Sequence, residues 1–258
     1  RLVYGIILSM ETALVFVLGL VLGSFANAAL WRLEKGKSML WARSECVHCY
    51  HRLGFWDLIP VLSFLFLRGR CRYCRRKISW QYPVVELIFG LAVLFIYRYS
   101  GGLAEAIFLA GMFLITFLIF VYDLKFLIIP DVLVVLGLAW ILLGGFWLAP
   151  PLAPDAVWIA LAVFLFFFLM HKFSRGRWVG GGDAKLGFML GLWLGWPAGI
   201  LGLFLAYVTG AIVGLGLMAF KKVTLKSQIP FGPFLIAGAW IVFLWGEYIL
   251  KWYGEIPL

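Results

Sequence analysis

Residues 103–125 read LAEAIFLAGMFLITFLIFVYDLK, an apolar run over 103–122 that ends at an aspartate, Asp123. About 20 apolar residues are what an α-helix needs to cross a bilayer, whereas a transmembrane strand needs about ten residues of alternating polarity. The run therefore predicts a membrane-spanning helix with Asp123 at its C-terminal end. Comparable runs recur, and we expect an all-α integral membrane protein, a polytopic bundle of about eight transmembrane helices. The expected spans are 4–31, 83–98, 103–122, 131–149, 156–171, 184–195, 197–220 and 232–252.

The composition of the chain agrees with this fold class. Its 258 residues are 64% hydrophobic and 13% charged, whereas soluble proteins are about half apolar and a quarter charged. The net charge of +10 comes from 22 Lys and Arg, of which eleven fall at 32–81 and eight more at 125, 172–185 and 221–226. Alternating spans place all of these on one side of the membrane, which is the positive-inside bias of cytoplasmic loops. We therefore expect no nucleic-acid partner.

A polar and basic insert interrupts the apolar pattern between the first two expected spans. We predict three parts: a first transmembrane helix at 1–31, a small cytoplasmic zinc module at 32–82 and a transmembrane core at 83–258. The basic side chains of the insert are expected to face anionic lipid headgroups.

All four cysteines of the chain lie in this insert, as two C-x-x-C pairs 21 residues apart. They are Cys46, Cys49, Cys71 and Cys74. Two such pairs suit one tetrahedral zinc ion, which would stabilise a module too small to have much core of its own. The alternative is two disulfides, which a reducing cytoplasm disfavours. His48 and His51 could compete as ligands, but four thiolates already complete a structural site.

The aspartates at the ends of apolar runs are the candidate catalytic residues. An acid at a membrane boundary is costly, and Asp123 and Asp183 therefore indicate acid/base hydrolysis of a membrane-bound substrate. Asp123 ends one expected helix and Asp183 begins another, and these ends carry opposite partial charge. We predict that ionised Asp183 activates a water while protonated Asp123 donates to the scissile carbonyl. Lys125 and Lys185 lie close enough in sequence to modify or reverse this assignment.

Residues around the second aspartate are candidates for support of the site. Gly180 and Gly182 belong to a glycine triplet that would let an extended substrate approach Asp183, although a plain flexible loop is the alternative. Lys185 follows in the same stretch. Asp131 comes directly after Pro130, and it either begins a helix or belongs to the site.

Two polar residues of the first half are further candidates. Asn27 lies three residues after Ser24, beside Gly23, and these could form a polar patch or pack as small residues against another helix. Glu86 could support a substrate or methylation site, or it could pair with a nearby arginine.

Several motifs together resemble the type IV prepilin peptidase family. They are Gly23-Ser24-Phe25-Ala26-Asn27, the two C-x-x-C pairs, Tyr82-Pro83 with Glu86, Asp123-Leu124 with Ile129-Pro130-Asp131, Gly180-Gly181-Gly182-Asp183-Ala184-Lys185 and Pro230-Phe231-Gly232-Pro233. The resemblance covers nearly the whole chain. Ala26 and Val47 depart from the usual family pattern, and neither touches the aspartates.

The resemblance implies a bacterial inner-membrane aspartyl protease of the G-x-G-D type, with Asp123 and Asp183 as its catalytic pair. Family members remove the basic leader of prepilins and of type II secretion pseudopilins, after a glycine and on the cytoplasmic side. Members with a cysteine insert often also methylate the new N-terminus with S-adenosylmethionine. Two rival functions stay open from the residues alone: a transporter or channel that uses the aspartates, and a scaffold built on the zinc module.

Overall fold

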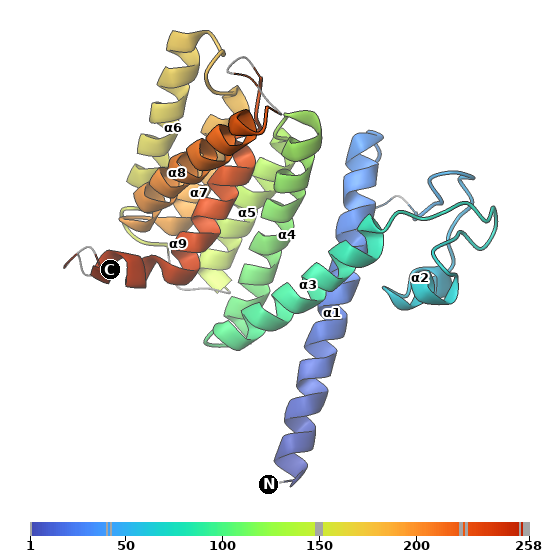
Figure 1. The fold of residues 1–258 in the computed structure, drawn as a ribbon. Helices are drawn as coiled ribbons and strands as arrows, with labels where there is room; N and C mark the ends of the chain where they lie inside the picture. The colour runs from blue at the N-terminus through green and yellow to red at the C-terminus, as the bar shows by residue number, and fades with distance from the viewer. Residues whose placement is uncertain are drawn as a thin grey trace. The chain divides into compact units, whose positions relative to one another are not determined.

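The computed structural model describes residues 2–39, 41, 43–147, 152–221, 224, 227–252 and 254, without the side chains of residues 2–9 and 146. Lys222 and Lys226, which contribute to the basic bias, lie outside the described residues. The elements in chain order are α1 (Leu2–Glu34), η1 (Phe55–Asp57), α2 (Leu62–Phe66), α3 (Gln81–Tyr99), α4 (Leu103–Phe126), α5 (Asp131–Trp147), α6 (Ala156–Ser174), α7 (Gly181–Leu194), α8 (Ala198–Ala219) and α9 (Gly232–Trp252) (Figure 1).

The expected helical membrane protein is confirmed. Over the described ranges the chain forms no strand, only two isolated bridges in the insert. Eight of the described helices match the eight expected spans, and six of them are long and apolar enough to cross a membrane. The two shorter ones are α5 and α7, with 17 and 14 residues.

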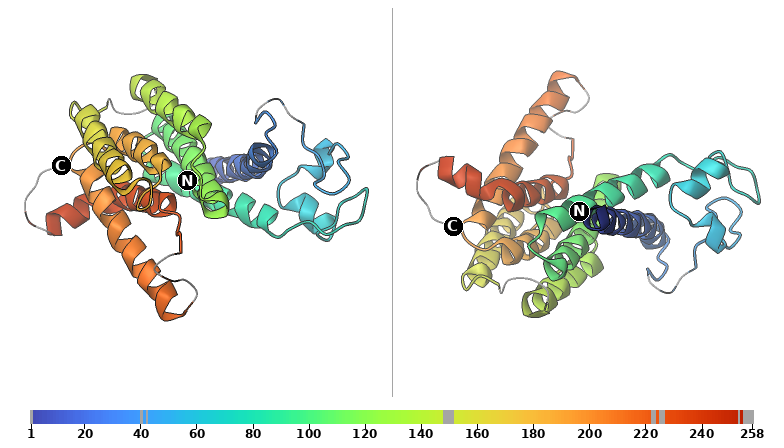
Figure 2. Two further views of the ribbon diagram at one scale, coloured as in Figure 1. Left: turned by 90° about the horizontal axis from the view of Figure 1, so that it is seen from above. Right: turned by 90° about the horizontal axis from the view of Figure 1, so that it is seen from below.

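The chain divides into two compact units, Arg1–Ala110 and Gly111–Leu258. In the first unit, α1 packs along α3 because glycines let the two backbones approach closely. A Cβ on Gly23 would lie 2.7 Å from the Cα of Glu86, and one on Gly90 would lie 2.7 Å from the ring of Phe16. Figure 2 shows the insert, coloured blue to cyan, extending away from this helix pair.

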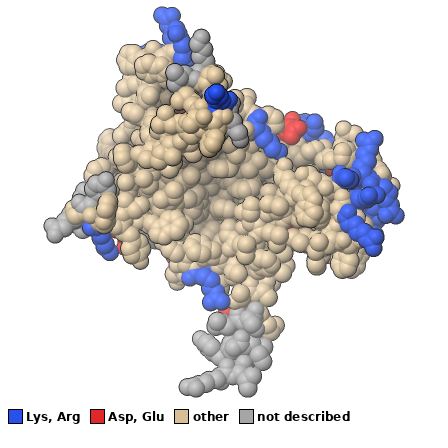
Figure 3. All heavy atoms as spheres, in the orientation of Figure 1, with Lys and Arg blue, Asp and Glu red and all other residues tan. Residues whose placement is uncertain are grey.

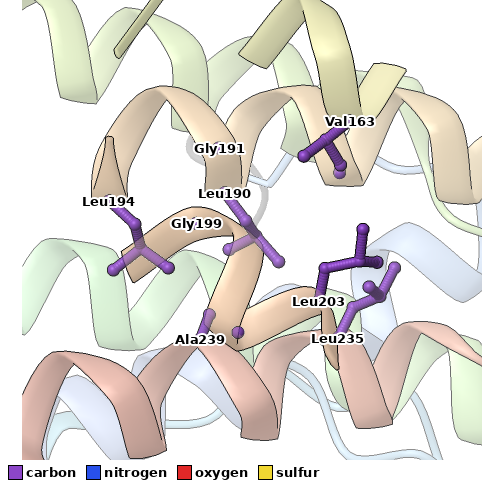
Figure 4. A pocket seen from close by; sticks show the side chains of 10 residues that line it. Val163, Leu190, Gly191, Leu194, Gly199, Leu203, Leu235 and Ala239 are labelled. Carbon is purple, nitrogen blue, oxygen red and sulfur yellow. The ribbon is translucent and has the colours of Figure 1, made fainter. Parts of the chain in front are cut away.

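In the second unit, α7 contacts α5, α6, α8 and α9, which makes it the central helix of this part. Glycines again allow the close contacts: a Cβ on Gly187 would lie 2.8 Å from Val163 of α6. A narrow pocket between these helices is lined by apolar residues alone, among them Val163, Leu203 and Leu235 (Figure 4). Without an ionisable side chain it is not a reaction site.

Candidate active site and metal centre

Asp123 lies in the last turn of α4 with a buried carboxylate, 4% exposed. The backbone N–H of Gly232, at the start of α9, donates to its Oδ2 at 3.1 Å. A Cβ on Gly232 would lie 2.6 Å from the same oxygen. Only a residue without a side chain therefore fits against this carboxylate.

Asp183 lies in the first turn of α7 and is 7% exposed. Its Oδ2 accepts the backbone N–H of Gly180 at 3.0 Å, and its own N–H donates to the Gly180 carbonyl at 3.2 Å. This reciprocal arrangement satisfies free N–H groups at the start of the helix. The carboxylate is thus held at the N-terminus of α7, as the sequence predicted.

Ile129 joins the two halves of the site. A Cβ on Gly182 would lie 3.0 Å from the Cβ of Ile129, and a Cβ on Gly232 would lie 3.3 Å from its Cδ1. Ile129 therefore packs against both the segment before Asp183 and the segment that binds Asp123. The two aspartates lie close enough for their charges to interact. The structure brings together the pair that the sequence singled out.

The two aspartates lie at opposite ends of their own helices, but their carboxylates have similar surroundings. Asp123 ends its own helix, but its carboxylate meets the first N–H of α9. Both acids therefore accept one N–H from the start of a helix. The division into acid and base that rests on their own helices stays a prediction.

Asp131 and Lys185 form an ion pair next to the site. The Nζ of Lys185 lies 2.7 Å from Oδ1 of Asp131, and the two side chains are 50% and 68% exposed. Asp131 is the first residue of α5, and Lys185 lies in the first turns of α7. The pair connects two helix starts at the surface.

Asn27 and Glu86 lie in the first unit, where both are buried. Oε2 of Glu86 accepts the N–H of Val61 at 2.7 Å, and Nδ2 of Asn27 donates to the Tyr82 carbonyl at 3.2 Å. No arginine in the described ranges forms an ion pair with Glu86. Oδ1 of Asn27 is buried without a hydrogen-bond partner among the described residues. Among the described residues, the carboxylate of Glu86 therefore has no cation paired with it, and the amide oxygen of Asn27 has no donor.

The cysteines gather at one point of the insert. All four sulfur atoms lie within 4.8 Å of one another, and all four thiols are free. The two C-x-x-C pairs make the same backbone hydrogen bond. The N–H of residue 50 donates to the carbonyl of Cys46, and the N–H of residue 75 donates to that of Cys71. Tetrahedral zinc with four thiolates requires sulfurs about 3.8 Å apart, and the Sγ atoms of Cys46 and Cys74 lie 3.9 Å apart.

Electrostatics in this cluster favour the thiolate of one member, Cys46, whereas the pKa values of Cys49 and Cys71 are raised by burial and by the neighbouring thiols. Burial raises the pKa of Cys46, but the backbone N–H groups of Cys49 and His48 outweigh it and lower this pKa to about 7. His51 packs against Tyr73 with ring centroids 3.7 Å apart and the rings tilted by 35°, and it is not part of the cluster. The four cysteines can therefore hold a metal ion without a histidine.

The insert also presents a basic surface. Lys and Arg side chains gather on one side of the described part of the insert (Figure 3). The exposed members between residues 68 and 77 are Arg68, Arg70, Arg72, Arg75, Arg76 and Lys77. Asp57 offsets part of this charge: burial raises the pKa of its carboxyl, but hydrogen bonds from Arg72 and Gly54 lower it below its ordinary value.

Sequence reasoning missed three residues of the site: Gly232, Ile129 and His171. Gly232 belongs to a motif quoted for the resemblance, but nothing in the sequence connected it with Asp123. Nδ1 of His171 lies 2.9 Å from the carbonyl of Val179, just before the glycine triplet. One local signal existed for His171, because it lies twelve residues before Asp183 at the end of the preceding apolar run.

Comparison with known proteins gives matches along most of the chain. The family model described as "Type IV leader peptidase family" matches residues 107–215, and "Bacterial Peptidase A24 N-terminal domain" matches residues 17–99. A protein of Aeromonas hydrophila is 35% identical over 93% of each chain, and one of Pseudomonas putida is 34% identical over 94% of each. A protein of Bacillus subtilis (strain 168) is 31% identical over 95% of this chain and 99% of its own. All three are named prepilin leader peptidase/N-methyltransferase. No solved structure matches.

Proposed function

The chain belongs to the type IV leader peptidase family, and from that premise we propose that it is a membrane aspartyl endopeptidase with Asp123 and Asp183 as its catalytic pair. It removes the basic leader of prepilins or pseudopilins after a glycine, and it methylates the new N-terminus. The observation that carries the assignment is a pair of buried carboxylates at helix ends, each with one backbone donor, whose neighbouring glycines both pack against Ile129.

The reaction needs one carboxyl group that is ionised and one that is protonated. The ionised member takes a proton from a water that attacks the scissile carbonyl, while the protonated member donates to the carbonyl oxygen. Collapse of the tetrahedral intermediate then breaks the C–N bond: the base gives the proton that it took from water to the leaving amine, and the acid recovers its proton from the hydroxyl of the intermediate. We assign the base to Asp183 and the acid to Asp123, and proton sharing makes titration a property of the pair.

The remaining candidates of the second unit support this pair. Gly180 supplies an N–H to Asp183, and Gly182 allows the close contact with Ile129. Asp131 and Lys185 hold the starts of α5 and α7 together through their ion pair. None of these four needs to react with the substrate.

For the methylation we propose a supporting role for Glu86 and Asn27. Methyl transfer requires the freed amine and a cationic methyl donor, S-adenosylmethionine, which supplies the methyl group. A buried carboxylate and an amide oxygen without a partner suit a cationic or amine group, which would provide the missing donor. These residues lie in the first unit, whereas the aspartates lie in the second.

The cysteine cluster would hold a structural zinc ion. The four thiolates leave no open coordination position, so the ion would stabilise the insert rather than take part in hydrolysis. We place the insert and the aspartates on the cytoplasmic side of a bacterial inner membrane, where the exposed basic side chains meet anionic lipids. Prepilin leaders are basic too, and enzyme and substrate would meet on the same lipid surface.

The test is processing of a purified prepilin by the full chain in nanodiscs, with mass spectrometry of the new N-terminus. The wild-type protein should cut after a glycine, and Asp123→Asn and Asp183→Asn should each abolish cleavage while keeping bound metal. An added methyl mass should appear only with S-adenosylmethionine. Cleavage by both variants at the wild-type rate would contradict the proposal and favour transport or a scaffold role.

A further inference from the structure

His171 lies in the last turn of α6 and is half-buried behind the glycine triplet. Its Nδ1 lies 2.9 Å from the carbonyl oxygen of Val179. A carbonyl can only accept, so Nδ1 must carry the hydrogen of this bond. The contact therefore fixes the ring in the form that is protonated at Nδ1.

The peptide bond between Val179 and Gly180 is held at both of its polar atoms. Its carbonyl accepts from His171, and its N–H donates to Oδ2 of Asp183 at 3.0 Å. In a trans peptide the C=O and the N–H point in opposite directions, so one rigid group connects the imidazole with the carboxylate. Hydrogen bonds in such a chain polarise and strengthen one another.

The ring is also held in place by its surroundings. A Cβ on Gly176 would lie 3.2 Å from Cε1 of His171, and one on Gly181 would lie 3.8 Å from the same atom. The N–H of Gly176 donates to the His171 carbonyl at 2.8 Å, where the chain turns out of α6. The ring therefore lies between the two ends of the loop that leads to Asp183.

We propose that His171 is a positioning residue for Asp183, which it orients through the Val179–Gly180 peptide. The imidazole fixes the plane of this peptide, and the peptide aims the Gly180 N–H at the carboxylate. His171 itself does not touch the substrate. This inference rests on the proposed role of Asp183.

Two substitutions separate the nitrogen that faces Val179 from the other ring nitrogen. His171→Asn places an amide nitrogen near the position of Nδ1, whereas His171→Gln places its amide near Nε2. With a prepilin substrate in nanodiscs, Asn should retain kcat within about threefold, and Gln should lower kcat about tenfold with KM nearly unchanged. Equal losses in both variants, or no loss in Gln, would overturn the proposal.

A control addresses general weakening of the loop. Ser174→Ala removes another side-chain hydrogen bond from α6 to this loop, in which Trp178 N donates to Ser174 Oγ at 3.3 Å. It should change kcat by less than about threefold. A loss as large as that of His171→Gln would show that only loop anchoring matters, and this too would overturn the proposal.

A second measurement does not depend on cleavage. The chain has three histidines, so nitrogen-15 NMR of histidine-labelled protein can be assigned with His171→Asn. We expect a proton on Nδ1 of His171 at neutral pH. A neutral ring protonated only at Nε2 would overturn the inference even if the protease is active. If the wild-type protein cleaves no prepilin, the proposed function fails while an Nδ1 proton still supports the contact.

Discussion

The backbone N–H of Gly232 is hydrogen-bonded to the carboxylate of Asp123, although 109 residues separate the two in the chain. The start of α9 thereby forms one wall of the site, and it shares its contact with Ile129 with the glycine triplet.

Gly232→Ala should strongly reduce cleavage. The new Cβ would lie 2.6 Å from Oδ2 of Asp123 and would displace the carboxylate; a shift of about 1 Å in a catalytic group can cost about 100-fold in rate. The measurement is kcat/KM for a prepilin. Gly216→Ala in α8, where nothing lies within 4 Å of a Cβ, is the matched control and should retain the wild-type value. Wild-type activity in Gly232→Ala would contradict the described contact.

The glycine triplet should tolerate alanine at its middle position only. A Cβ on Gly181 meets nothing closer than 3.8 Å, whereas a Cβ on Gly182 would lie 3.0 Å from Ile129. We expect Gly181→Ala to stay within about threefold of wild-type kcat/KM and Gly182→Ala to lose about tenfold or more. Equal activities of the two variants would show that Ile129 does not pack against this helix start.

The Asp131–Lys185 pair should stabilise the second unit only slightly. Both side chains are half exposed or more, and such pairs contribute about 0.2–1 kcal/mol. A double-mutant cycle with Asp131→Ala and Lys185→Ala, measured by unfolding in detergent, should give a coupling energy in this range. Each single variant should cleave within about threefold of wild type. If a single variant folds but does not cleave, the substituted residue takes part in catalysis.

Substitution of Glu86 or Asn27 should affect methylation and spare cleavage. Glu86→Gln removes the negative charge but keeps an acceptor for Val61, and Asn27→Ala removes the oxygen that has no partner. We expect about tenfold weaker methylation of an already trimmed pilin, and weaker equilibrium binding of S-adenosylmethionine or of the pilin amine. A parallel loss of cleavage would show that these residues serve the fold or the protease instead.

Removal of the proposed zinc ion should loosen the insert first. A module of about 50 residues has little core, so chelation should raise the rate of proteolysis between residues 35 and 80 about tenfold or more. Cys46→Ser should have the same effect, and Asp183→Asn should bind one zinc per chain, like wild type. Absence of bound metal together with blocked thiols would instead indicate the disulfide alternative.

The helices were predictable because their apolar runs have the length of a bilayer. The expected span 103–122 became Leu103–Phe126, and Asp123 lies at its end as predicted. The span expected at 184–195 begins earlier, at Gly181, so Asp183 is the third residue of the helix and not its first. Local propensity disfavours glycine in a helix, and the packing around α7 overrides it.

The contacts between distant segments were not predictable from one sequence. Nothing in the local pattern joins Gly232 to Asp123 or Ile129 to Gly182, because each contact depends on how the helices pack. For the same reason, the place of Asp123 at the end of its own helix could not reveal that an N–H of α9 donates to its carboxylate. The cysteine cluster was predictable because spacing alone indicates tetrahedral ligation.

The shortness of α7 has a consequence for the depth at which a substrate is cut. Its 14 residues extend about 21 Å, against about 30 Å for a hydrocarbon core. At the end away from Asp183, Trp196 N donates to Asp155 Oδ2 at 2.6 Å, which ties the end of α7 to the start of α6. Because α5, α6, α8 and α9 contact α7 and bury most of it, the shortfall is met at its first turn, so that Asp183 lies deeper than the end of a full-length span would. Lipids with shorter acyl chains should therefore speed cleavage, because less of a substrate helix has to leave the membrane before its first residues reach the aspartates.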